Sequence, residues 1–573
     1  MPVTNADVAD LFEHMAELLE VQRENPFRVR AYRRAAQTIS GLGESVATMV
    51  ERGDDLTELP GIGDDLAGKI AEIVARGRLA ALDRLARRLP GQVAEMLRLP
   101  GLGPKRVALL HEKLGIRTLA QLEAACRDGK VRDLPGIGEK TEARILEALA
   151  QASPVVSGRT RIDVAGEVVA PLVEHLRGCP AVKDLVVAGS FRRRAETVGD
   201  LDILAVAGDA KAAVERFTRY DTVREVLAAG DTRASVMLQR GLQVDLRVVG
   251  PEAAGAALLY LTGSKAHNIA LRKRAIARGL KLNEYGLFRG RTRVAGRSEK
   301  EVYAALDLPF VEPELREDRG ELDAAEAGRL PRLVAARDLR GDLHAHTDAS
   351  DGMDSLEAMA EAAEAAGYEY LAITDHTRHL AIAHGLDPRR LARQLGKIDR
   401  LNAKRKGLVL LKSAEVDILE DGTLDLPDSL LAELDLVVAA VHSHFSLSAA
   451  AQTRRVLRAM DNARLGILAH PTGRLIGERA PYAIDLERVM QGAVERGCFL
   501  ELNAQPERLD ANDVACRRAK EMGLKVAIST DAHSADDLGL VRYGIDQARR
   551  AWLEPDDVLN TRSLAALRKL LRR

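Results

Sequence analysis

The sequence has few cysteines and no long apolar run. Its 573 residues include four scattered cysteines, Cys126, Cys179, Cys498 and Cys516, with no Cys-x-x-Cys pair. This excludes a disulfide framework and a thiolate zinc site. No apolar stretch approaches the ~20 residues needed to cross a bilayer, and residues 1–20 form an amphipathic pattern without the basic start of a signal peptide. We therefore expect a cytoplasmic protein of about three to five domains.

The sequence also lacks a large net charge. The formal charge is −1, so the molecule is not a polycation and any nucleic-acid binding requires a local basic patch. One such patch, residues 265–297, contains ten lysines and arginines and a single acid, Glu284. Histidine is unevenly distributed, with nine of thirteen lying after residue 340. This clustering favours metal chemistry in the C-terminal part.

A five-residue pattern, Leu-Pro-Gly-hydrophobic-Gly, recurs at 59–63, 99–103 and 134–138. Its glycines permit a tight turn with positive φ, and the free N–H groups of a following helix can bind a phosphate. The pattern resembles the helix-hairpin-helix motif, which implies contacts with the DNA backbone that do not read the bases. The glycines expected at these contacts are Gly61, Gly63, Gly101, Gly103, Gly136 and Gly138.

Three segments are predicted as buried strands that carry aspartate: 184–189, 200–206 and 243–249. Asp200 and Asp202 share a face because strand side chains alternate, and Asp245 lies in the third strand. Three carboxylates on one sheet repel one another unless cations lie among them. Oxygen ligands suit Mg²⁺ or Mn²⁺, and two such ions activate a hydroxyl and stabilise a leaving phosphate. The sequence therefore predicts a two-metal site.

The segments around these aspartates resemble the palm of family X DNA polymerases, the relatives of DNA polymerase beta. The resemblance rests on Gly-Ser-Phe-Arg-Arg at 189–193, Gly-Asp-Leu-Asp at 199–202, Tyr-Leu-Thr-Gly-Ser at 260–264 and Leu-Asn-Glu-Tyr-Gly at 282–286. It implies that Asp200, Asp202 and Asp245 are catalytic metal ligands, with Asp245 nearest the primer 3′ hydroxyl. The implied nucleotide contacts are Ser190, Arg193, Arg161, Tyr260, Gly263 and Asn268, and the implied DNA contacts in the basic patch include Lys265 and Arg272.

Two positions qualify this resemblance. Leu261 stands where the family usually has an aromatic residue that helps to exclude the ribose 2′ hydroxyl, which leaves sugar selectivity open. Residues 1–85 resemble the family's small lyase domain, with Tyr32-Arg33 in a matching helix and Lys69 at the Schiff-base lysine. The neighbouring acids, Asp64 and Asp65, favour the charged and unreactive amine. Lys69 is therefore either a lyase nucleophile or a lysine that faces DNA or solvent.

From residue 339 the chain repeats strand, loop and helix at intervals of roughly 27 to 40 residues. Seven such units predict a parallel (β/α)7 barrel. Most strands end in His, Asp or Glu, and imidazole with carboxylate and no thiolate suits zinc, manganese or iron. Nine candidate ligands suffice for about two or three ions, with Glu415 as the natural bridge. These candidates are His344, His346, Asp351, His376, Glu415, His442, His470, Asp531 and His533.

The barrel resembles the PHP family, named for polymerase and histidinol phosphatase. The resemblance rests on the His-x-His opening at 344–346, the Thr-Asp-His turn at 374–376 and the final Asp-x-His at 531–533. All nine candidates match the family's trinuclear site, with Asp351 in a position where some members have histidine. We expect Arg474 and Asn503 to be further contacts with substrate.

The whole chain resembles the bacterial and archaeal PolX architecture. This implies filling of short gaps with dNTPs, together with 3′–5′ exonuclease or related 3′-end processing, including abasic-site cleavage. The pathway would be base excision repair or end joining, and the protein a monomer. Two alternatives remain: a DNA-end binding scaffold with weak polymerase action, and a small-molecule phosphatase fused to the polymerase.

The predicted fold class is multidomain. It comprises an α-helical N-terminal region with helix-hairpin-helix motifs, an α+β nucleotidyltransferase palm with a fingers or thumb subdomain, and the α/β barrel. The predicted boundaries are 1–85 and 86–153 for the two helical parts, 154–250 for the palm, 251–315 for the nucleotide- and template-binding subdomain, 316–338 for a linker helix and 339–573 for the barrel.

Overall fold

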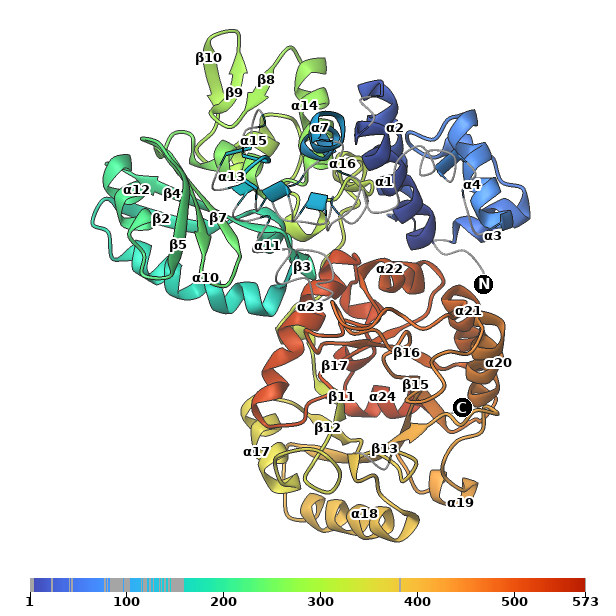
Figure 1. Cartoon of the computed structure of the whole chain (residues 1–573). Coiled ribbons are helices and arrows are strands. Elements are labelled where there is room, and N and C mark those ends of the chain that lie inside the picture. The colour runs from blue at the N-terminus through green and yellow to red at the C-terminus, as the bar shows by residue number, and fades with distance from the viewer. Residues whose placement is uncertain are drawn as a thin grey trace. The chain divides into compact units, whose positions relative to one another are not determined.

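The computed structural model divides into two compact units (Figure 1). One comprises Met1–Gly158 with the short segments Ser448–Ala450 and Ala483–Glu487, and the other comprises the rest of the chain from Arg159. The structure describes residues 5–21, 24–40, 42, 45–76, 79, 81–82, 96, 102, 104–114, 116, 121–122, 125–126, 128–132, 134, 137–138, 141–142, 145, 159–380 and 383–571. No helix in these residues is both long and apolar enough to span a membrane.

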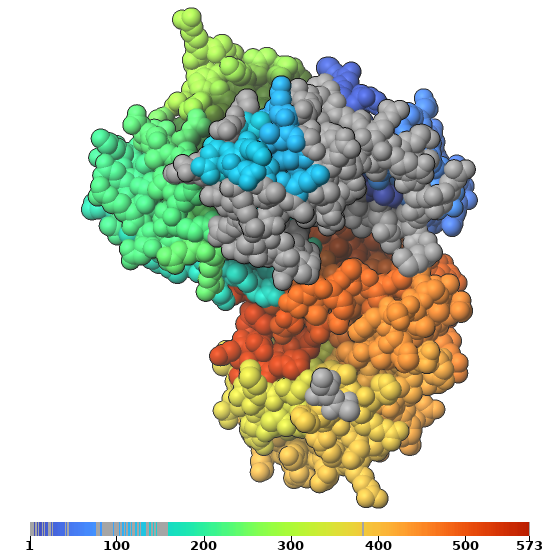
Figure 2. Space-filling view, in the orientation of Figure 1, coloured from blue at the N-terminus to red at the C-terminus, as the bar shows by residue number. Residues whose placement is uncertain are grey.

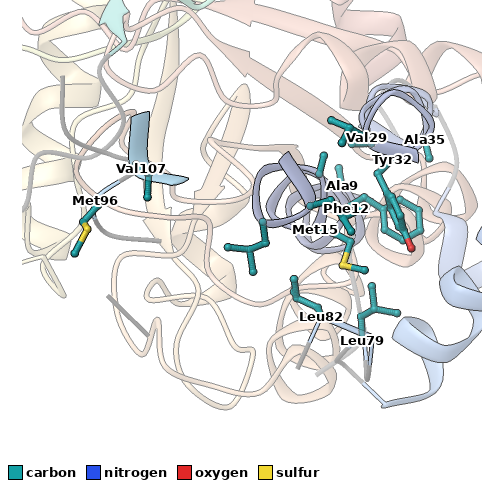
Figure 3. Packing of buried hydrophobic residues seen from close by; sticks show 14 of the residues in the cluster. Ala9, Phe12, Met15, Val29, Tyr32, Ala35, Leu79, Leu82, Met96 and Val107 are labelled. Carbon is teal, nitrogen blue, oxygen red and sulfur yellow. The ribbon is translucent and has the colours of Figure 1, made fainter. Parts of the chain in front are cut away.

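The first unit is helical where it is described. Its elements are α1 (Asn5–Val21), α2 (Pro26–Ser40), α3 (Val46–Arg52), the 3₁₀ helix η1 (Leu56–Glu58), α4 (Asp64–Arg76) and α7 (Pro104–Leu114). Apolar residues at helical spacing give each helix one buried face. Phe12 of α1 packs edge-on against Tyr32 of α2, with ring centroids 5.5 Å apart, and Figure 3 shows both among the buried residues of this core.

The first predicted hairpin lies between η1 and α4. Gly61 has a left-handed backbone, with a φ of +81°, and the Gly63 carbonyl accepts the Ala67 N–H at 2.9 Å in the first turn of α4. In the third copy, the Gly138 carbonyl accepts N–H groups from Thr141 and Glu142. The predicted glycines Gly101, Gly103 and Gly136 lie outside the described residues.

The palm of the second unit is a five-stranded sheet in the order β2-β4-β7-β6-β5. The central pair, β4 and β7, is parallel and the other pairs are antiparallel. Helices α10, α11 and α12 accompany the sheet, and a two-stranded ribbon of β1 and β3 lies apart from it. The bounds are β1 (Thr160–Arg161), α10 (Ile162–Arg177), β2 (Val182–Val187), α11 (Gly189–Arg192), β3 (Thr197–Val198), β4 (Asp200–Ala207), α12 (Ala210–Thr218), β5 (Val223–Ala229), β6 (Arg233–Leu238) and β7 (Gln243–Val249).

A smaller subdomain follows the palm. It contains α13 (Ala254–Thr262), α14 (Lys265–Ala277), a three-stranded antiparallel sheet of β8 (Lys281–Asn283), β9 (Gly286–Arg289) and β10 (Thr292–Ala295), and α15 (Glu299–Ala304). The single linker helix expected at 316–338 is wrong. Short helices η2 (Pro313–Leu315), α16 (Glu321–Glu326) and η3 (Ala336–Asp338) occur instead, because Arg316 and Glu321 are buried in ionic contacts with the subdomain.

The predicted (β/α)7 barrel is confirmed: seven parallel strands run in sequence order from β11 to β17. The Ala345–Ala532 bridge brings the first strand next to the end of the last. The strands are β11 (Gly341–Ala345), β12 (Tyr370–Ile373), β13 (Val409–Asp417), β14 (Leu436–Ala440), β15 (Leu465–Leu468), β16 (Phe499–Asn503) and β17 (Val526–Ser529). The helices are α17 (Leu356–Ala365), α18 (Pro388–Asn402), α19 (Asp428–Leu431), α20 (Ala449–Met460), α21 (Leu486–Arg496), α22 (Asp513–Glu521), α23 (Val541–Arg550) and α24 (Leu564–Leu571), with 3₁₀ helices η5 (Asp536–Leu540), η6 (Pro555–Asp557) and η7 (Leu559–Thr561).

Successive residues of the barrel strands belong to two different cores. Leu371 and Leu410 pack in the cluster that includes α17 and α18, whereas Ala372 and Leu411 pack in the cluster that includes α24. This alternation follows from the two-residue period of strands. Because both faces of the strands are covered, the strands are continuously apolar, as parallel sheets require.

In Figure 2 the surfaces of the palm, in green, and of the barrel, in yellow to red, meet along one boundary.

Candidate active sites

A pocket of about 550 Å³ lies where β4, α11, α13 and α14 meet. Its walls contain most residues that the resemblance assigned to nucleotide and DNA. Those that line it are Asp200, Asp202, Ser190, Arg193, Tyr260, Gly263, Asn268, Lys265 and Arg272. Segments far apart in the sequence are thus brought together in one cavity.

The sheet register sets the three aspartates side by side on neighbouring strands. Asp202 on β4 pairs with Asp245 on β7, and Asp200 is two residues away on the same face of β4. Asp245 accepts hydrogen bonds from the Ser235 hydroxyl and from Gln243 Nε2, the latter at 3.1 Å. Among the described residues, the three carboxylates do not form a group whose oxygens all lie within 4.8 Å of one another. The register supports a shared site, while Asp245 is held by Ser235 and Gln243.

Burial and neighbouring carboxylates raise the pKa of Asp200 and of Asp202. Burial, followed by the charges of Asp200 and Asp245, raises the pKa of Asp202 to about 7. Burial and the charge of Asp245 also raise the pKa of Asp200. Such repulsion disfavours the ionised forms, and a divalent cation placed among the carboxylates would reverse it. The donor set therefore fits a hard cation such as Mg²⁺ or Mn²⁺.

The turn between β2 and α11 requires a glycine at its first position. Gly189 has a φ of +61°, and a Cβ there would lie 2.5 Å from Asp202 Oδ2. Further along the turn, Arg193 Nε donates to Glu317 at 3.0 Å and Arg193 Nη1 donates to the Thr262 carbonyl at 2.6 Å. The close approach of the turn to β4 puts the arginine in the same cavity as the carboxylates.

Two arginines near this pocket differ from the sequence interpretation. Arg161 is not among the lining residues, because its guanidinium binds Asp163 at 2.9 Å. Arg159, two residues earlier, lines the pocket and donates to the Thr197 hydroxyl and carbonyl. Sequence reasoning missed Arg159. The sequence shows only that two arginines, Arg159 and Arg161, lie two residues apart. The β1–β3 ribbon determines which of the two side chains reaches the pocket.

Nine side chains meet at the C-terminal ends of the barrel strands. Glu415 lies among the histidines: His470 Nε2 is 2.9 Å and His442 Nε2 is 3.2 Å from Glu415 Oε1, and His376 Nδ1 is 2.9 Å from Oε2. Three groups have ligand atoms within 4.8 Å of one another: His346, Asp351, His376 and His533; His344, His346 and Asp531; and His376, Glu415 and His442. All nine predicted ligands therefore belong to one cluster.

The imidazoles of this cluster fit a metal centre. His344 Nε2, His346 Nδ1 and His376 Nδ1 are buried and make no hydrogen bond of proper geometry with any described residue, although His376 Nδ1 lies 2.9 Å from Glu415 Oε2. Buried polar atoms are rarely left unpaired, and a neutral imidazole nitrogen with a free lone pair is a metal ligand. Histidine and carboxylate oxygens without thiolate suit zinc, manganese or iron.

Electrostatics inside the cluster favour positive charge. Burial alone would lower the pKa of His376, but the Glu415 and Asp351 carboxylates raise it to about 10. Burial likewise opposes charge on His442, and Glu415 with Asp417 raises its pKa to about 9. Burial would raise the pKa of Glu415, yet the surrounding histidines hold it well below its usual range. Cations would satisfy the same carboxylates without protonating the imidazoles.

Two carboxylates that sequence reasoning missed hold the histidine rings. Glu501 lies 2.7 Å from His344 Nδ1 and accepts the His470 backbone N–H at 2.7 Å. Asp417 lies 3.0 Å from His442 Nδ1. Such contacts fix which ring nitrogen faces a metal. Asp417 is the last residue of β13, and Glu501 lies two residues before the end of β16; a carboxylate in the last residues of a barrel strand is the signal by which sequence reasoning could have found them.

The two further contacts expected in the barrel have other partners. Asn503 donates to Asp531 Oδ2 at 3.0 Å and to Glu501 Oε2 at 3.2 Å, so it holds a candidate ligand. Arg474 is half-buried, and its guanidinium binds Glu196 of the palm at 2.6 Å. Arg474 therefore joins the barrel to the palm.

In the first unit, Lys69 lies in α4 beside Asp65 and 5.3 Å from the centre of the Tyr32 ring. Burial would lower the pKa of its amine, but the hydrogen bonds to Asp65 and Tyr32 outweigh burial and raise it. The amine is therefore held in its charged form near neutral pH.

Comparison with known proteins agrees with this arrangement. Family models match residues 3–79 (Helix-hairpin-helix domain), 93–151 (SAM-like Helix-hairpin-helix tandem), 257–317 (DNA polymerase beta thumb) and 342–418 (PHP domain). The DNA polymerase/3'-5' exonuclease PolX of Bacillus subtilis (strain 168) is 39% identical over 572 residues, which cover 99% of each chain. The chain belongs to the PolX family. The predicted family and fold class are thereby confirmed.

Part of the chain also resembles shorter proteins. A probable phosphatase of Thermoanaerobacter sp. (strain X514) is 31% identical over 231 residues, which cover 38% of this chain and 89% of that protein. A probable phosphatase of Syntrophotalea carbinolica is 30% identical over 230 residues, 38% of this chain and 90% of that protein. This part of the chain is thus similar to nearly the full length of these shorter proteins.

Proposed function

We propose that this PolX-family chain is a DNA polymerase that fills short gaps from dNTPs. Ser190 and Arg193 bind the triphosphate, while Tyr260, Gly263 and Asn268 contact the nucleoside. Asp200, Asp202 and Asp245 would hold Mg²⁺ or Mn²⁺, which would lower the pKa of the primer hydroxyl and neutralise charge on the phosphate. Asp245 takes the proton of the 3′ hydroxyl, the 3′ oxygen bonds to the α-phosphorus, and pyrophosphate leaves. The observation that carries this proposal is one pocket lined by nine of the implied residues.

The barrel is the 3′–5′ exonuclease of the same chain. Its nine candidate ligands would hold two or three ions of zinc, manganese or iron, at about three or four ligands per ion. Such ions would activate a water molecule near neutral pH and bind the phosphate. Glu501, Asp417 and Asn503 orient the ligands through the contacts described above. Related 3′-end processing and abasic-site cleavage belong to the same proposal.

DNA is gripped by the helix-hairpin-helix turns at Gly61, Gly63, Gly101, Gly103, Gly136 and Gly138, and by Lys265 and Arg272 beside the pocket. We assign residues 1–85 and 86–153 to DNA binding, 154–250 to the palm, 251–315 to the nucleotide- and template-binding subdomain and 339–573 to the exonuclease. The two activities together suit base excision repair or end joining.

A single assay tests both sites. A 5′-labelled primer facing a one-nucleotide gap is incubated with Mn²⁺, with and without dNTPs. Extension should be lost in Asp202→Asn and retained in His344→Ala, and shortening should show the reverse. The matched control is Asp184→Asn, which changes an exposed aspartate on the neighbouring strand β2 and should leave both activities unchanged.

The alternatives predict other outcomes. A DNA-end binding scaffold neither extends nor shortens the primer, although it binds gapped DNA. A fused small-molecule phosphatase hydrolyses p-nitrophenyl phosphate in a His344-dependent reaction but does not shorten the primer.

A further inference from the structure

Two neighbours, Glu317 and Thr262, hold the Arg193 side chain in place. Its Nε donates to Glu317 Oε1 at 3.0 Å and its Nη1 donates to the Thr262 carbonyl at 2.6 Å. Its Nη2 makes no hydrogen bond within the described part of the chain, and the residue lines the pocket that contains Asp200 and Asp202. Nε and Nη1 are therefore engaged within the protein, and Nη2 is available to donate to a ligand in the pocket.

The anchor, Glu317, is shared with a residue of the barrel. Arg550, at the end of α23, donates from Nη1 to the same Glu317 oxygen at 2.9 Å and to the Arg193 backbone carbonyl at 2.7 Å. Its Nη2 lies 3.1 Å from Asp513 on α22. Figure 1 shows α23 beside α11 and β3 of the palm. Arg550 thus contacts both the backbone and the side-chain partner of Arg193 and lines no part of the pocket.

Burial makes this arrangement sensitive to a missing charge. Burial would raise the pKa of Glu317, but Arg550 and then Arg193 hold it below its usual range, so Glu317 is ionised. Only 8% of the Arg550 side chain and 17% of the Glu317 side chain are exposed. A buried carboxylate needs a paired cation. Without Arg550, Arg193 would be the nearest cation to Glu317 and would be drawn away from an incoming phosphate.

We infer that Arg550 of the barrel is a positioning residue for dNTP binding in the palm. It neutralises Glu317 and fixes the Arg193 carbonyl, so that the Arg193 guanidinium stays available for the triphosphate. This inference rests on the proposed role of Arg193 in nucleotide binding. It also assigns the C-terminal barrel a part in the polymerase reaction that is separate from its own metal centre.

The test compares two adjacent arginines of α23 in the full-length protein. Arg550→Gln should raise KM for dNTP in single-nucleotide gap filling by about tenfold, the scale of one charge-assisted hydrogen bond, with little change in kcat. Arg549→Gln is the matched control. It removes an ion pair from the same helix to Glu314 of η2, at 2.7 Å, which does not involve Arg193, and KM should be unchanged. Primer shortening should be unchanged in both variants.

A double-mutant cycle identifies the route of the effect. If Arg550 acts through Arg193, Arg550→Gln should add nothing to the KM of Arg193→Gln, whereas independent effects would multiply. If Arg550→Gln does not fold, Arg550→Lys replaces it. A single ammonium cannot make both of the shared contacts, so KM should rise by a smaller factor, about threefold.

The outcomes separate this inference from the proposed function. If Arg193→Gln raises KM but the Arg550 variants do not, the inference is overturned and the nucleotide site stands. An equal rise in Arg549→Gln also overturns it, because the effect would then belong to the interface in general. If Arg193→Gln itself leaves KM unchanged, the proposed role of Arg193 fails and this inference fails with it.

Discussion

The reactivity of a lysine depends on what surrounds its amine. In α4, Lys69 has a carboxylate, Asp65, one helical turn before it and the Tyr32 ring close by. A Schiff base forms only from the neutral amine, and these neighbours raise the pKa of Lys69. The position matches a lyase nucleophile, but the environment keeps it protonated.

We therefore expect little lyase activity from Lys69 at neutral pH. Because the pKa is raised, the neutral amine becomes populated only as pH rises toward it, so adduct formation should increase with pH. Borohydride trapping on DNA with a deoxyribose aldehyde measures this directly. Asp65→Asn removes a partner that raises the pKa and should increase the yield of adduct. Efficient trapping at pH 7, lost in Lys69→Arg, would contradict this prediction.

Gly189 shows how one missing side chain shapes the polymerase site. Two features of this position disfavour any residue other than glycine. The backbone φ is +61°, and an added Cβ would lie only 2.5 Å from Asp202 Oδ2. Gly189→Ala should abolish extension because the methyl group displaces Asp202. Gly241→Ala provides the control: its φ is +79° but nothing lies within 4 Å of the new Cβ. Both substitutions cost about 1–2 kcal/mol of backbone strain, so their melting temperatures should be similar. If extension is lost in Gly189→Ala alone, the loss comes from the contact with Asp202 and not from backbone strain.

At the scale of elements, parallel strands decide where chemistry gathers. The barrel strands all end on one side, so ligands on different strands converge, as in other β/α barrels. In the palm, the parallel pairing of β4 with β7 does the same for Asp202 and Asp245. Strand β16 contributes Glu501, which holds His344 and the His470 backbone.

Glu501→Gln should weaken metal binding without removing a metal ligand. The amide cannot hold the His344 ring as a carboxylate does, and loss of such a partner typically reduces metal affinity by about 10- to 100-fold. The concentration of Mn²⁺ needed for half-maximal primer shortening should rise accordingly, while extension is unchanged. Glu521→Gln, at an exposed ion pair with Arg517 on α22, should have no effect. An unchanged Mn²⁺ requirement in Glu501→Gln would be evidence against the orienting role.

At the scale of the whole second unit, palm and barrel are joined by ion pairs that are buried or half-buried. Arg474 binds Glu196, Arg550 binds Glu317, and Arg319 binds Asp513 at 2.9 Å.

The presence of two activities on one chain has a chemical use. The polymerase needs a free 3′ hydroxyl, and a 3′-directed exonuclease can expose one.

We expect the barrel to prepare blocked ends for extension. His344→Ala should abolish extension of a gapped primer that ends in a 3′ phosphate and should spare extension of a primer that ends in a 3′ hydroxyl. Product lengths on a denaturing gel give the result. Equal loss on both primers would mean that the barrel substitution damages the polymerase itself, and equal retention would mean that the barrel does not process this end.

Much of this protein was predictable from sequence because the relevant patterns are local or periodic. The repeated glycine turns, the alternating palm strands and the recurring strand ends of the barrel each follow from a short stretch of chain. The barrel and the convergence of its nine candidate ligands were therefore predicted, since the ends of parallel strands meet on one side whatever the intervening loops.

Only the tertiary structure decided which residues support those sites. Arg159 rather than Arg161 lines the pocket because a two-stranded ribbon orients both. The segment expected to be a linker helix buries Arg316 and Glu321, and Arg474 binds the palm instead of facing the metal ligands. The last two outcomes depend on pairing between charged residues far apart in sequence. Burial makes such pairing obligatory, but no local pattern specifies the partner.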